Sequence, residues 1–239
     1  MEAFSISDCQ GRGVEFLTFP SPHWEALTPE TQNTFHLVGR LPFIQSFNMA
    51  GGTGLALHLG HRFSVDLVLF SPRDDSVGPD ERAILRAALE EPSLTITHDK
   101  DMTFVAHWRG VGISFFRLSL YPLVEPLLLL NGVPVDSLLE IGAMKLAAII
   151  DRGTRKDLVD FYYILQRVSP DDLFRVAVVK YARVRTFAIS ATRALAYFDD
   201  AEALPMPRML DQTPWQMMKR FLEYQAVEAG RNRLHDLWM

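Results

Sequence analysis

A pair of glycines and a single acid form a stretch that could bind a phosphate and a metal ion. Gly51-Gly52 follows an apolar segment, 43–50, that predicts a strand, and the apolar spacing after the glycines predicts a helix. Asp66 lies in a second predicted strand, 64–70, and is its only acid. A helix start offers backbone N–H groups and the positive end of its dipole to an anion. A carboxylate beside it could hold a Mg²⁺ that neutralises the same phosphates.

Each residue of this stretch also has a plainer interpretation. A lone strand acid such as Asp66 usually faces solvent, and two glycines can simply supply a tight turn with positive φ. Arg62 could neutralise phosphate charge or could equally be structural. The two glycines between a strand and a helix, with Ser64 close to Asp66, favour the functional interpretation of the acid.

Two histidines lie near the predicted end of this helix. His58 and His61 are three residues apart, a spacing that could place two metal ligands close together. A zinc site needs a third and a fourth ligand, and the sequence offers no evident candidates. We therefore expect these histidines to be surface or half-buried residues.

A second candidate is a lysine in the apolar segment 141–150. Lys145 is the only charge in that run. Such a lysine must reach along its apolar neighbours to water, pair with an acid, or face a charged ligand. Asp157 follows in the next predicted helix, where Thr154 and Asp157 fit a helix cap.

These two regions together resemble the AbiEii/AbiGii toxin family of nucleotidyltransferase-fold proteins. The resemblance covers about residues 25 to 170 and rests on two strings in order, Gly51-Gly52-Thr53-x-Leu55-x-Leu57…His61-Arg62-x-Ser64-x-Asp66 and Ala143-Met144-Lys145-Leu146-Ala147-Ala148…Asp151-Arg152-Gly153…Lys156-Asp157-x-x-Asp160.

The chain departs from the family pattern at two acids. The family places a second acid two residues after the first, and here that position is Val68. Two carboxylates at i and i+2 of a strand point to the same face, which is how such a pair holds two metal ions. A third acid is expected on the later strand 112–117, which holds none; Glu125 is near but falls in the next segment.

The resemblance implies a role for each matched residue. Mg²⁺ would sit on Asp66, the backbone N–H groups of Gly52 and Thr53 would hold a triphosphate, and Lys145 would offset charge on the phosphates. Asp157 would pair with Lys145 or contact substrate, and it is the best candidate for a general base. Asp160, one turn further, is a weaker match.

Composition indicates a globular protein without the overall excess of basic residues that would suggest binding of nucleic acid over its whole surface; a local basic patch is still compatible with it. The 239 residues are 48% hydrophobic with a net charge of −5, long enough for a proper core. The single cysteine, Cys9, cannot form an intramolecular disulfide, which favours a reducing cytoplasm. The first residues lack the pattern of a signal peptide, and the apolar runs are too short to span a membrane.

The predicted elements place this chain in the α+β class. We expect a nucleotidyltransferase fold, a mixed sheet with flanking helices, over residues 1–135. A helical domain over residues 136–239 should complete the site cleft, since the helical pattern begins near residue 135. The strands include a hairpin over 94–108 and a segment that the turn Asn131-Gly132 closes.

The function that this implies is nucleotide transfer from an NTP to an acceptor such as tRNA. The protein would be the toxin of a bacterial toxin–antitoxin, or abortive infection, system, with a cognate antitoxin and no membrane partner. Because Val68 replaces an acid, an alternative is a catalytically degenerate module with the same fold that binds nucleotide or a partner. A purely structural partner protein would bind no nucleotide at all.

Overall fold

The computed structural model describes residues 3–7, 13–72, 77–89 and 92–236. Cys9, the middle of the predicted loop 72–79 and the predicted helix end at 90–91 lie outside the described residues. The chain divides into two compact units, Met1–Ser137 and Leu138–Met239. The boundary expected from the sequence, between residues 135 and 136, falls two residues earlier in the chain.

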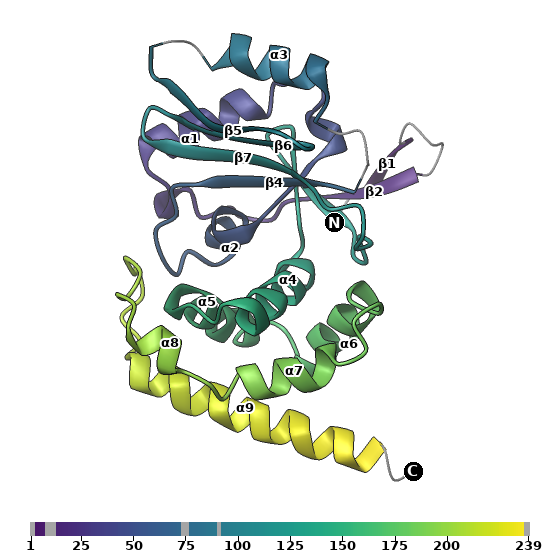
Figure 1. Ribbon diagram of the computed structural model, residues 1–239, viewed down its shortest axis with the longest axis vertical. Helices are drawn as coiled ribbons and strands as arrows, with labels where there is room; N and C mark the ends of the chain where they lie inside the picture. Colours follow the sequence, from purple (N-terminus) through teal and green to yellow (C-terminus); the bar gives the residue numbers. More distant parts are fainter. Residues whose placement is uncertain (1–2, 8–12, 73–76, 90–91, 237–239) are drawn as a thin grey trace. The chain divides into compact units, whose positions relative to one another are not determined.

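The first unit is built on a mixed sheet of nine strands (Figure 1). The order is β1-β2-β8-β9-β3-β4-β7-β6-β5, with β2/β8, β9/β3 and β4/β7 parallel and the other neighbours antiparallel. The strands are β1 Ala3–Ser7, β2 Gly13–Thr18, β3 Asn48–Ala50, β4 Leu67–Ser71, β5 Leu94–Lys100, β6 Thr103–Trp108, β7 Val111–Arg117, β8 Leu127–Leu130 and β9 Val133–Val135.

Helices cover both faces of the sheet. Figure 1 shows α1 (Pro29–Val38) and α3 (Pro79–Ala88) over one face and α2 (Gly51–Leu59) over the other. Short 3₁₀ turns, η1 Trp24–Ala26 and η2 Ile44–Ser46, precede α1 and β3. The main core fills the side of α1 and α3, where large side chains are fully buried, among them Phe35, Leu67, Leu69, Leu85, Phe104 and Phe115. The faces of the strands can therefore be assigned from their alternating burial.

Two strands around the glycine pair differ from the prediction. The strand expected over 43–50 is only β3, Asn48–Ala50, because η2 occupies the residues before it. The strand expected over 64–70 begins at Leu67, so Asp66 precedes β4 rather than lying within it. Ser64 instead forms an isolated bridge with Leu27. Apolar composition identified both strands but could not show which residues find a pairing partner.

The predicted hairpin over 94–108 and the predicted Asn131-Gly132 turn are confirmed, although the hairpin turns at residues 101–102 and not at the expected 99–101. Asp101 and Met102, both with positive φ, join β5 to β6, and Asn131 and Gly132, with φ of 47° and 85°, join β8 to β9. Two successive positive φ values give the tightest hairpin connections the right twist, which explains the Asn-Gly pair.

The second unit is helical. It comprises α4 Leu138–Asp151, α5 Arg155–Leu165, α6 Pro170–Lys180, α7 Phe187–Ala194, α8 Asp199–Glu202 and α9 Trp215–Asp236. Thr154 and Ser169 cap α5 and α6 by accepting the backbone N–H three residues on. The short α8 was not expected from the sequence. No helix in the described part of the chain is long and apolar enough to cross a membrane.

Candidate functional site

The start of α2 is shaped for the close approach of another group. Gly51 has φ of +68°, a left-handed conformation that glycine adopts most readily. A methyl group at Gly52 would lie 2.7 Å from Nη2 of Arg62 and 3.1 Å from Oγ of Ser64. A glycine is thus required at each position for a different reason: at Gly51 for the positive φ, and at Gly52 for the close packing of Arg62 and Ser64.

Positive charge converges on this helix start. The side chain of Arg62 is 6% exposed, and its Nη1 donates to the carbonyl of Phe63 at 2.9 Å. The first turn of α2 contains no acid, and no side chain caps it at Ala50. Backbone N–H groups at a helix start and a guanidinium beside them are both groups that bind phosphate oxygens in proteins.

Thr53 positions the helix start rather than offering its hydroxyl to a ligand. Its side chain is fully buried, and the hydroxyl donates to the carbonyl of Asp66. A second hydrogen bond, 2.8 Å long, joins the hydroxyls of Thr53 and Ser64. These bonds tie the first turn of α2 to the residues just before β4, which fixes Asp66 beside the glycines.

Asp66 and Val68 lie on the α2 side of the sheet. Leu67 and Leu69 are buried in the core on the opposite side, so the residues between and before them face α2. Asp66 is exposed, and Val68 is half-buried, with its Cβ 3.6 Å from where a methyl group at Gly51 would lie. The position of the family's second acid is thus on the expected face and holds an aliphatic side chain.

The neighbouring strand supplies no third acid on this face. In the parallel pair β4/β7, Val68 lies beside Ser114. Two residues earlier in each segment, Asp66 lies over Gly112. A methyl group at Gly112 would be 2.5 Å from Oδ1 of Asp66. Asp66 therefore stands as the one carboxylate on this part of the described sheet face.

This donor set fits a Mg²⁺ ion that arrives with a triphosphate, not a preformed metal cage. Within the described residues no group of three or more His, Cys, Asp and Glu side chains could hold a metal ion. Mg²⁺ is often bound through one or two carboxylates together with substrate phosphates and water. The exposed carboxylate of Asp66 meets that requirement.

Lys145 is the centre of a buried ion cluster in the helical unit. Its Nζ lies 3.0 Å from Oδ1 of Asp157 and 2.6 Å from Oδ2 of Asp160, and both aspartates are fully buried. Arg152 binds the other side of Asp157, with Nε 2.9 Å from Oδ2. The one charge in the apolar run 141–150 of α4 is thus paired with acids from α5.

Asp157 is held in its ionised form. Burial by itself would raise the pKa of this carboxyl, but the charge of Lys145 and hydrogen bonds from Arg152 and Thr154 outweigh it and lower the pKa below the usual range. A carboxylate with so many donors is a weak proton acceptor, so the geometry does not favour Asp157 as a general base.

The candidate residues fall into two clusters, one in each unit. Gly51, Gly52, Thr53, Arg62, Ser64 and Asp66 are brought together in the first unit, and Lys145, Asp157 and Asp160 in the second. That both clusters act on one nucleotide remains a prediction.

His58 has a structural role that its spacing to His61 did not indicate. Its Nε2 is 2.8 Å from the backbone carbonyl of Asp136, and its ring stacks on Phe19 with centroids 4.4 Å apart. Burial lowers the pKa of His58 to about 4, so the ring is neutral at physiological pH. His58 is half-buried, as expected, but the same expectation is wrong for His61, which is buried at 2% exposure.

Several buried polar partners could not be found from sequence. Asn48 donates to the buried carboxylate of Asp136, 2.6 Å away, and Lys180 pairs with the buried Glu140. A lysine at the end of an amphipathic helix gives no signal of its partner, because the partner is 40 residues away.

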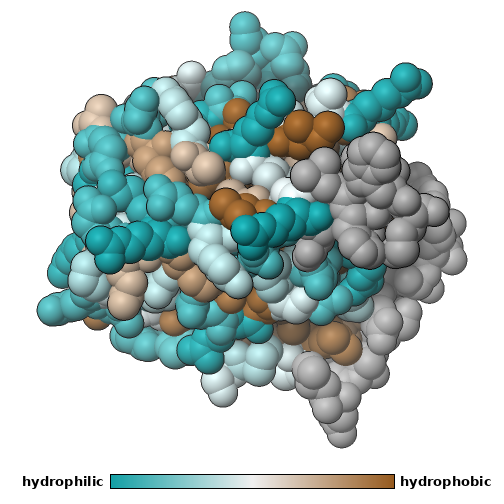
Figure 2. All heavy atoms as spheres, turned by 90° about the horizontal axis from the view of Figure 1, so that it is seen from below, coloured by the Kyte–Doolittle hydropathy of each residue, from teal (hydrophilic) through white to brown (hydrophobic). Residues whose placement is uncertain are grey.

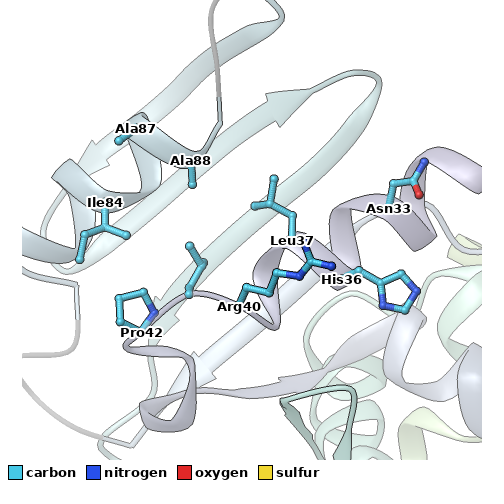
Figure 3. Close-up of a pocket in the computed structure, with 9 residues that line it drawn as sticks. Asn33, His36, Leu37, Arg40, Pro42, Ile84, Ala87 and Ala88 are labelled. Atoms are coloured by element: carbon cyan, nitrogen blue, oxygen red, sulfur yellow. The ribbon is translucent and has the colours of Figure 1, made fainter.

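A separate cavity of about 780 Å³ lies between α1 and α3 (Figure 3). It is lined by Asn33, His36, Leu37, Arg40, Leu41, Pro42, Ile84, Ala87 and Ala88. The helices that line it cover the sheet face opposite α2, and none of the candidate site residues belongs to it.

Comparison with solved structures shows the class of fold. JHP933 of Helicobacter pylori matches with a TM-score of 0.53 at 14% identity, covering 88% of this chain and 97% of its own. MenT4, a nucleotidyltransferase toxin of Mycobacterium tuberculosis, matches with a TM-score of 0.57 at 16% identity, covering 84% and 82%. The nucleotidyltransferase fold with C-terminal helices, predicted from the sequence, is confirmed.

Sequence comparison gives the family. Residues 36–233 match the nucleotidyl transferase AbiEii toxin family of type IV toxin–antitoxin systems, and the chain belongs to that family. A relative in Aquifex aeolicus, an uncharacterized protein, is 29% identical over 210 residues, which cover 86% of this chain and 98% of the relative. The recognition made from the two sequence strings is confirmed.

Proposed function

We propose that this toxin-family protein transfers a nucleotide from an NTP to an acceptor. The observation that carries the proposal is the uncapped start of α2, with Arg62 packed on Gly52 and the exposed carboxylate of Asp66 tied to the same turn through Thr53. A triphosphate needs cations and N–H donors, and its metal ion needs a carboxylate. This turn offers all three within one short stretch.

Each residue has a distinct task in this proposal. The N–H groups of Gly52 and Thr53 and the charge of Arg62 hold phosphate oxygens, and Asp66 holds the Mg²⁺, which when bound withdraws charge from the phosphates. Lys145 adds a second positive charge for the phosphates. Asp157 and Asp160 hold the side chain of Lys145 in place, and this role replaces the base role expected for Asp157.

An RNA acceptor, such as tRNA, is supported by a surface of the helical unit. Arg183, Arg185 and Arg193 are exposed and form no ion pair with any described residue, and Tyr197 of the same unit is 50% exposed. Arginines and exposed aromatic rings contact phosphates and stack on unpaired bases. Figure 2 shows a face on which small apolar areas are scattered among hydrophilic side chains.

The cellular setting follows from the family. We propose that the protein acts in the bacterial cytoplasm, where NTPs and tRNA are found, and that a cognate antitoxin encoded beside it limits its activity. A gene for a small DNA-binding protein directly upstream would support this assignment.

The rival function is nucleotide or partner binding without transfer. It is favoured by Val68 and by the absence of an acid at Gly112 and Ser114 on the described sheet face. Under this alternative the protein would bind a Mg²⁺–NTP tightly and turn over none of it.

The two functions are separated by one experiment. The purified protein is incubated with total tRNA, Mg²⁺ and each α-labelled NTP, beside Asp66→Asn as the matched control. Label transferred to RNA by the wild type and not by the variant supports nucleotide transfer. Asp66-dependent NTP binding without label transfer supports the rival, and no NTP binding to the wild type overturns both.

Val68→Asp tests whether the missing acid limits activity. The new carboxylate would lie two residues from Asp66 on the same half-buried face, so we expect tighter Mg²⁺ binding and faster transfer. A stable variant with unchanged metal and nucleotide binding would contradict this assignment of the pocket.

A further inference from the structure

A row of three residues crosses the sheet on the face that carries Asp66. Asp66 lies over Gly112 of β7, and Gly112 pairs with His107 of the antiparallel strand β6. The neighbours of His107, Ala106 and Trp108, are buried in the core on the other side. The imidazole therefore points to the same face as Asp66.

Gly112, the middle residue of this row, has no side chain. Adjacent strands are about 4.8 Å apart, so the backbones of Asp66 and His107 are separated by roughly 10 Å with no side chain between them. Oδ1 of Asp66 already leans over Gly112, into the space where a side chain would otherwise stand. The carboxylate of Asp66 thus fills the place of the missing side chain, on the same sheet face as the imidazole of His107 on the next strand.

His107 is available to a ligand. It is exposed, and no described side chain or backbone group binds its ring. By contrast, His58 is held by a backbone carbonyl and Phe19, and His23 is bound to Glu25 at 2.7 Å. An exposed imidazole with no partner among the described residues, two strands from Asp66 on the same sheet face, is positioned to contact what a metal ion on Asp66 would carry.

We propose that His107 is a phosphate-contacting residue of the nucleotide site, donating a ring N–H to an oxygen of the triphosphate whose Mg²⁺ is held by Asp66. A phosphate is a better partner for this ring than the ion itself, because Mg²⁺ prefers oxygen ligands. The inference rests on the proposed nucleotide site. It adds a contact from β6, which lies outside both sequence strings, the one around Gly51 and the one around Lys145.

The test measures Mg²⁺-dependent binding of each of the four NTPs, and of the matching nucleosides, to the full chain and its variants. His107→Ala should weaken binding of the preferred NTP about tenfold and leave the weak binding of its nucleoside unchanged, because the lost hydrogen bond goes to a charged phosphate. The matched control is His98→Ala, a histidine on the next strand, β5, which pairs with Val105 rather than with a residue of this row. Its affinity should stay at the wild-type value.

The outcomes separate this inference from the proposed function. If Asp66→Asn abolishes Mg²⁺-dependent NTP binding and His107→Ala does not weaken it, the role of His107 is overturned and the site at Asp66 stands. Equal losses for His107→Ala and His98→Ala would also overturn it, since they would indicate a general effect on the hairpin. If no NTP binds the wild type, the site and this contact fall together.

Discussion

At Gly52 a single methyl group would disturb the site more than the fold. We expect Gly52→Ala to weaken NTP binding strongly, because its Cβ would lie 2.7 Å from Nη2 of Arg62 and displace that guanidinium. Overpacking of this kind costs about 1–3 kcal/mol of stability, measurable by urea unfolding.

Gly230 provides the matched comparison for this substitution. It lies in α9, where a methyl group would meet only Thr192, at 3.8 Å. Gly230→Ala should therefore raise stability by about 0.5–1 kcal/mol through better helix propensity. A Gly52→Ala protein with unchanged stability and nucleotide affinity would contradict the packing described for Arg62.

The ion cluster around Lys145 predicts a large effect for a small change at Asp157. Asp157→Asn leaves Lys145 with Asp160 alone and removes the charge that holds Arg152. Breaking a buried pair costs roughly 3–5 kcal/mol at neutral pH. The exposed pair of Asp172 and Arg175 serves as a control, and Asp172→Asn should cost at most about 0.5 kcal/mol.

The effect at Asp157 should depend on pH in one direction. The folded pKa is lower than the unfolded one, so the carboxylate stabilises the fold above the ordinary pKa of an aspartate, about 3.9, and that contribution is lost as pH falls through the lower folded value. The stability gap between wild type and Asp157→Asn should therefore narrow below about pH 4. A gap that stays constant down to pH 2 would contradict the ionised, paired state.

At the scale of elements, α2 is fastened to the end of β9 by a histidine that must stay neutral. The folded pKa of His58 is about 4 because of burial, and in the unfolded chain it is near 6.5. As pH falls below 6.5, the histidine becomes protonated in the unfolded state but not in the folded state. The free energy of unfolding therefore decreases by about 1.4 kcal/mol per pH unit until pH 4.

This loss can be measured as the pH dependence of urea unfolding between pH 7 and pH 4. His58→Gln, which can keep a hydrogen bond to the carbonyl of Asp136 but cannot titrate, should lose much less stability over the same interval. His98→Gln, on β5, should behave like the wild type. Parallel pH profiles for all three proteins would show that His58 is not buried as described.

How far the sequence predicts these elements depends on where their signals lie. The Asn131-Gly132 turn and the Thr154 cap were predicted because each depends on the conformation of a few adjacent residues. The limits of β3 and the start of β4 were missed because strand ends are set by the partner strand. The long-range contact of His107 with Gly112 has no local signal, so it was missed entirely.

The candidate site shows the same division. The strings around Gly51 and Lys145 identified the residues, since their spacing is local. The sequence could not show that the hydroxyl of Thr53 donates to the carbonyl of Asp66, or that Asp157 pairs with both Arg152 and Lys145. These facts change the roles: Thr53 offers only its backbone, and Asp157 is no longer the favoured base.

Across the whole molecule, charge is divided unevenly. Residues 1–137 contain 9 basic and 16 acidic residues, a net charge of −7, and residues 138–239 contain 15 and 13, a net charge of +2. We therefore expect RNA binding to depend on the helical unit. Replacing Arg183, Arg185 and Arg193 by Gln should reduce the salt dependence of tRNA affinity by roughly one unit of slope per arginine.

Filter binding of labelled tRNA at several salt concentrations measures that slope. Triple replacement of Arg40, Arg82 and Arg86, in the first unit, is the control and should leave it unchanged. NTP affinity should be the same in both variants, because none of these arginines belongs to the proposed nucleotide site. An unchanged slope in the helical-unit variant would place the acceptor elsewhere.

Joint action of the two units on one nucleotide can be tested by a double-mutant cycle. Asp66→Asn and Lys145→Arg should each weaken Mg²⁺–NTP binding, Lys145→Arg because a bulkier cation cannot sit between Asp157 and Asp160 in the same way. If both groups act on one triphosphate, the double variant should lose less affinity than the sum of the single losses. Strict additivity, measured by calorimetry in folded variants, would indicate independent roles.

The two buried ammonium groups also give the protein a built-in chemical reporter. The sequence has only five lysines: Lys100, Lys156 and Lys219, and the buried Lys145 and Lys180. An amine-reactive reagent must reach the amine, so the two buried lysines should react slowly while Lys100 and Lys156, both exposed, are modified quickly. Mass spectrometry of the labelled peptides would then follow local opening of the helical unit at Lys180, and any change in the surroundings of Lys145 when nucleotide arrives, without a single substitution.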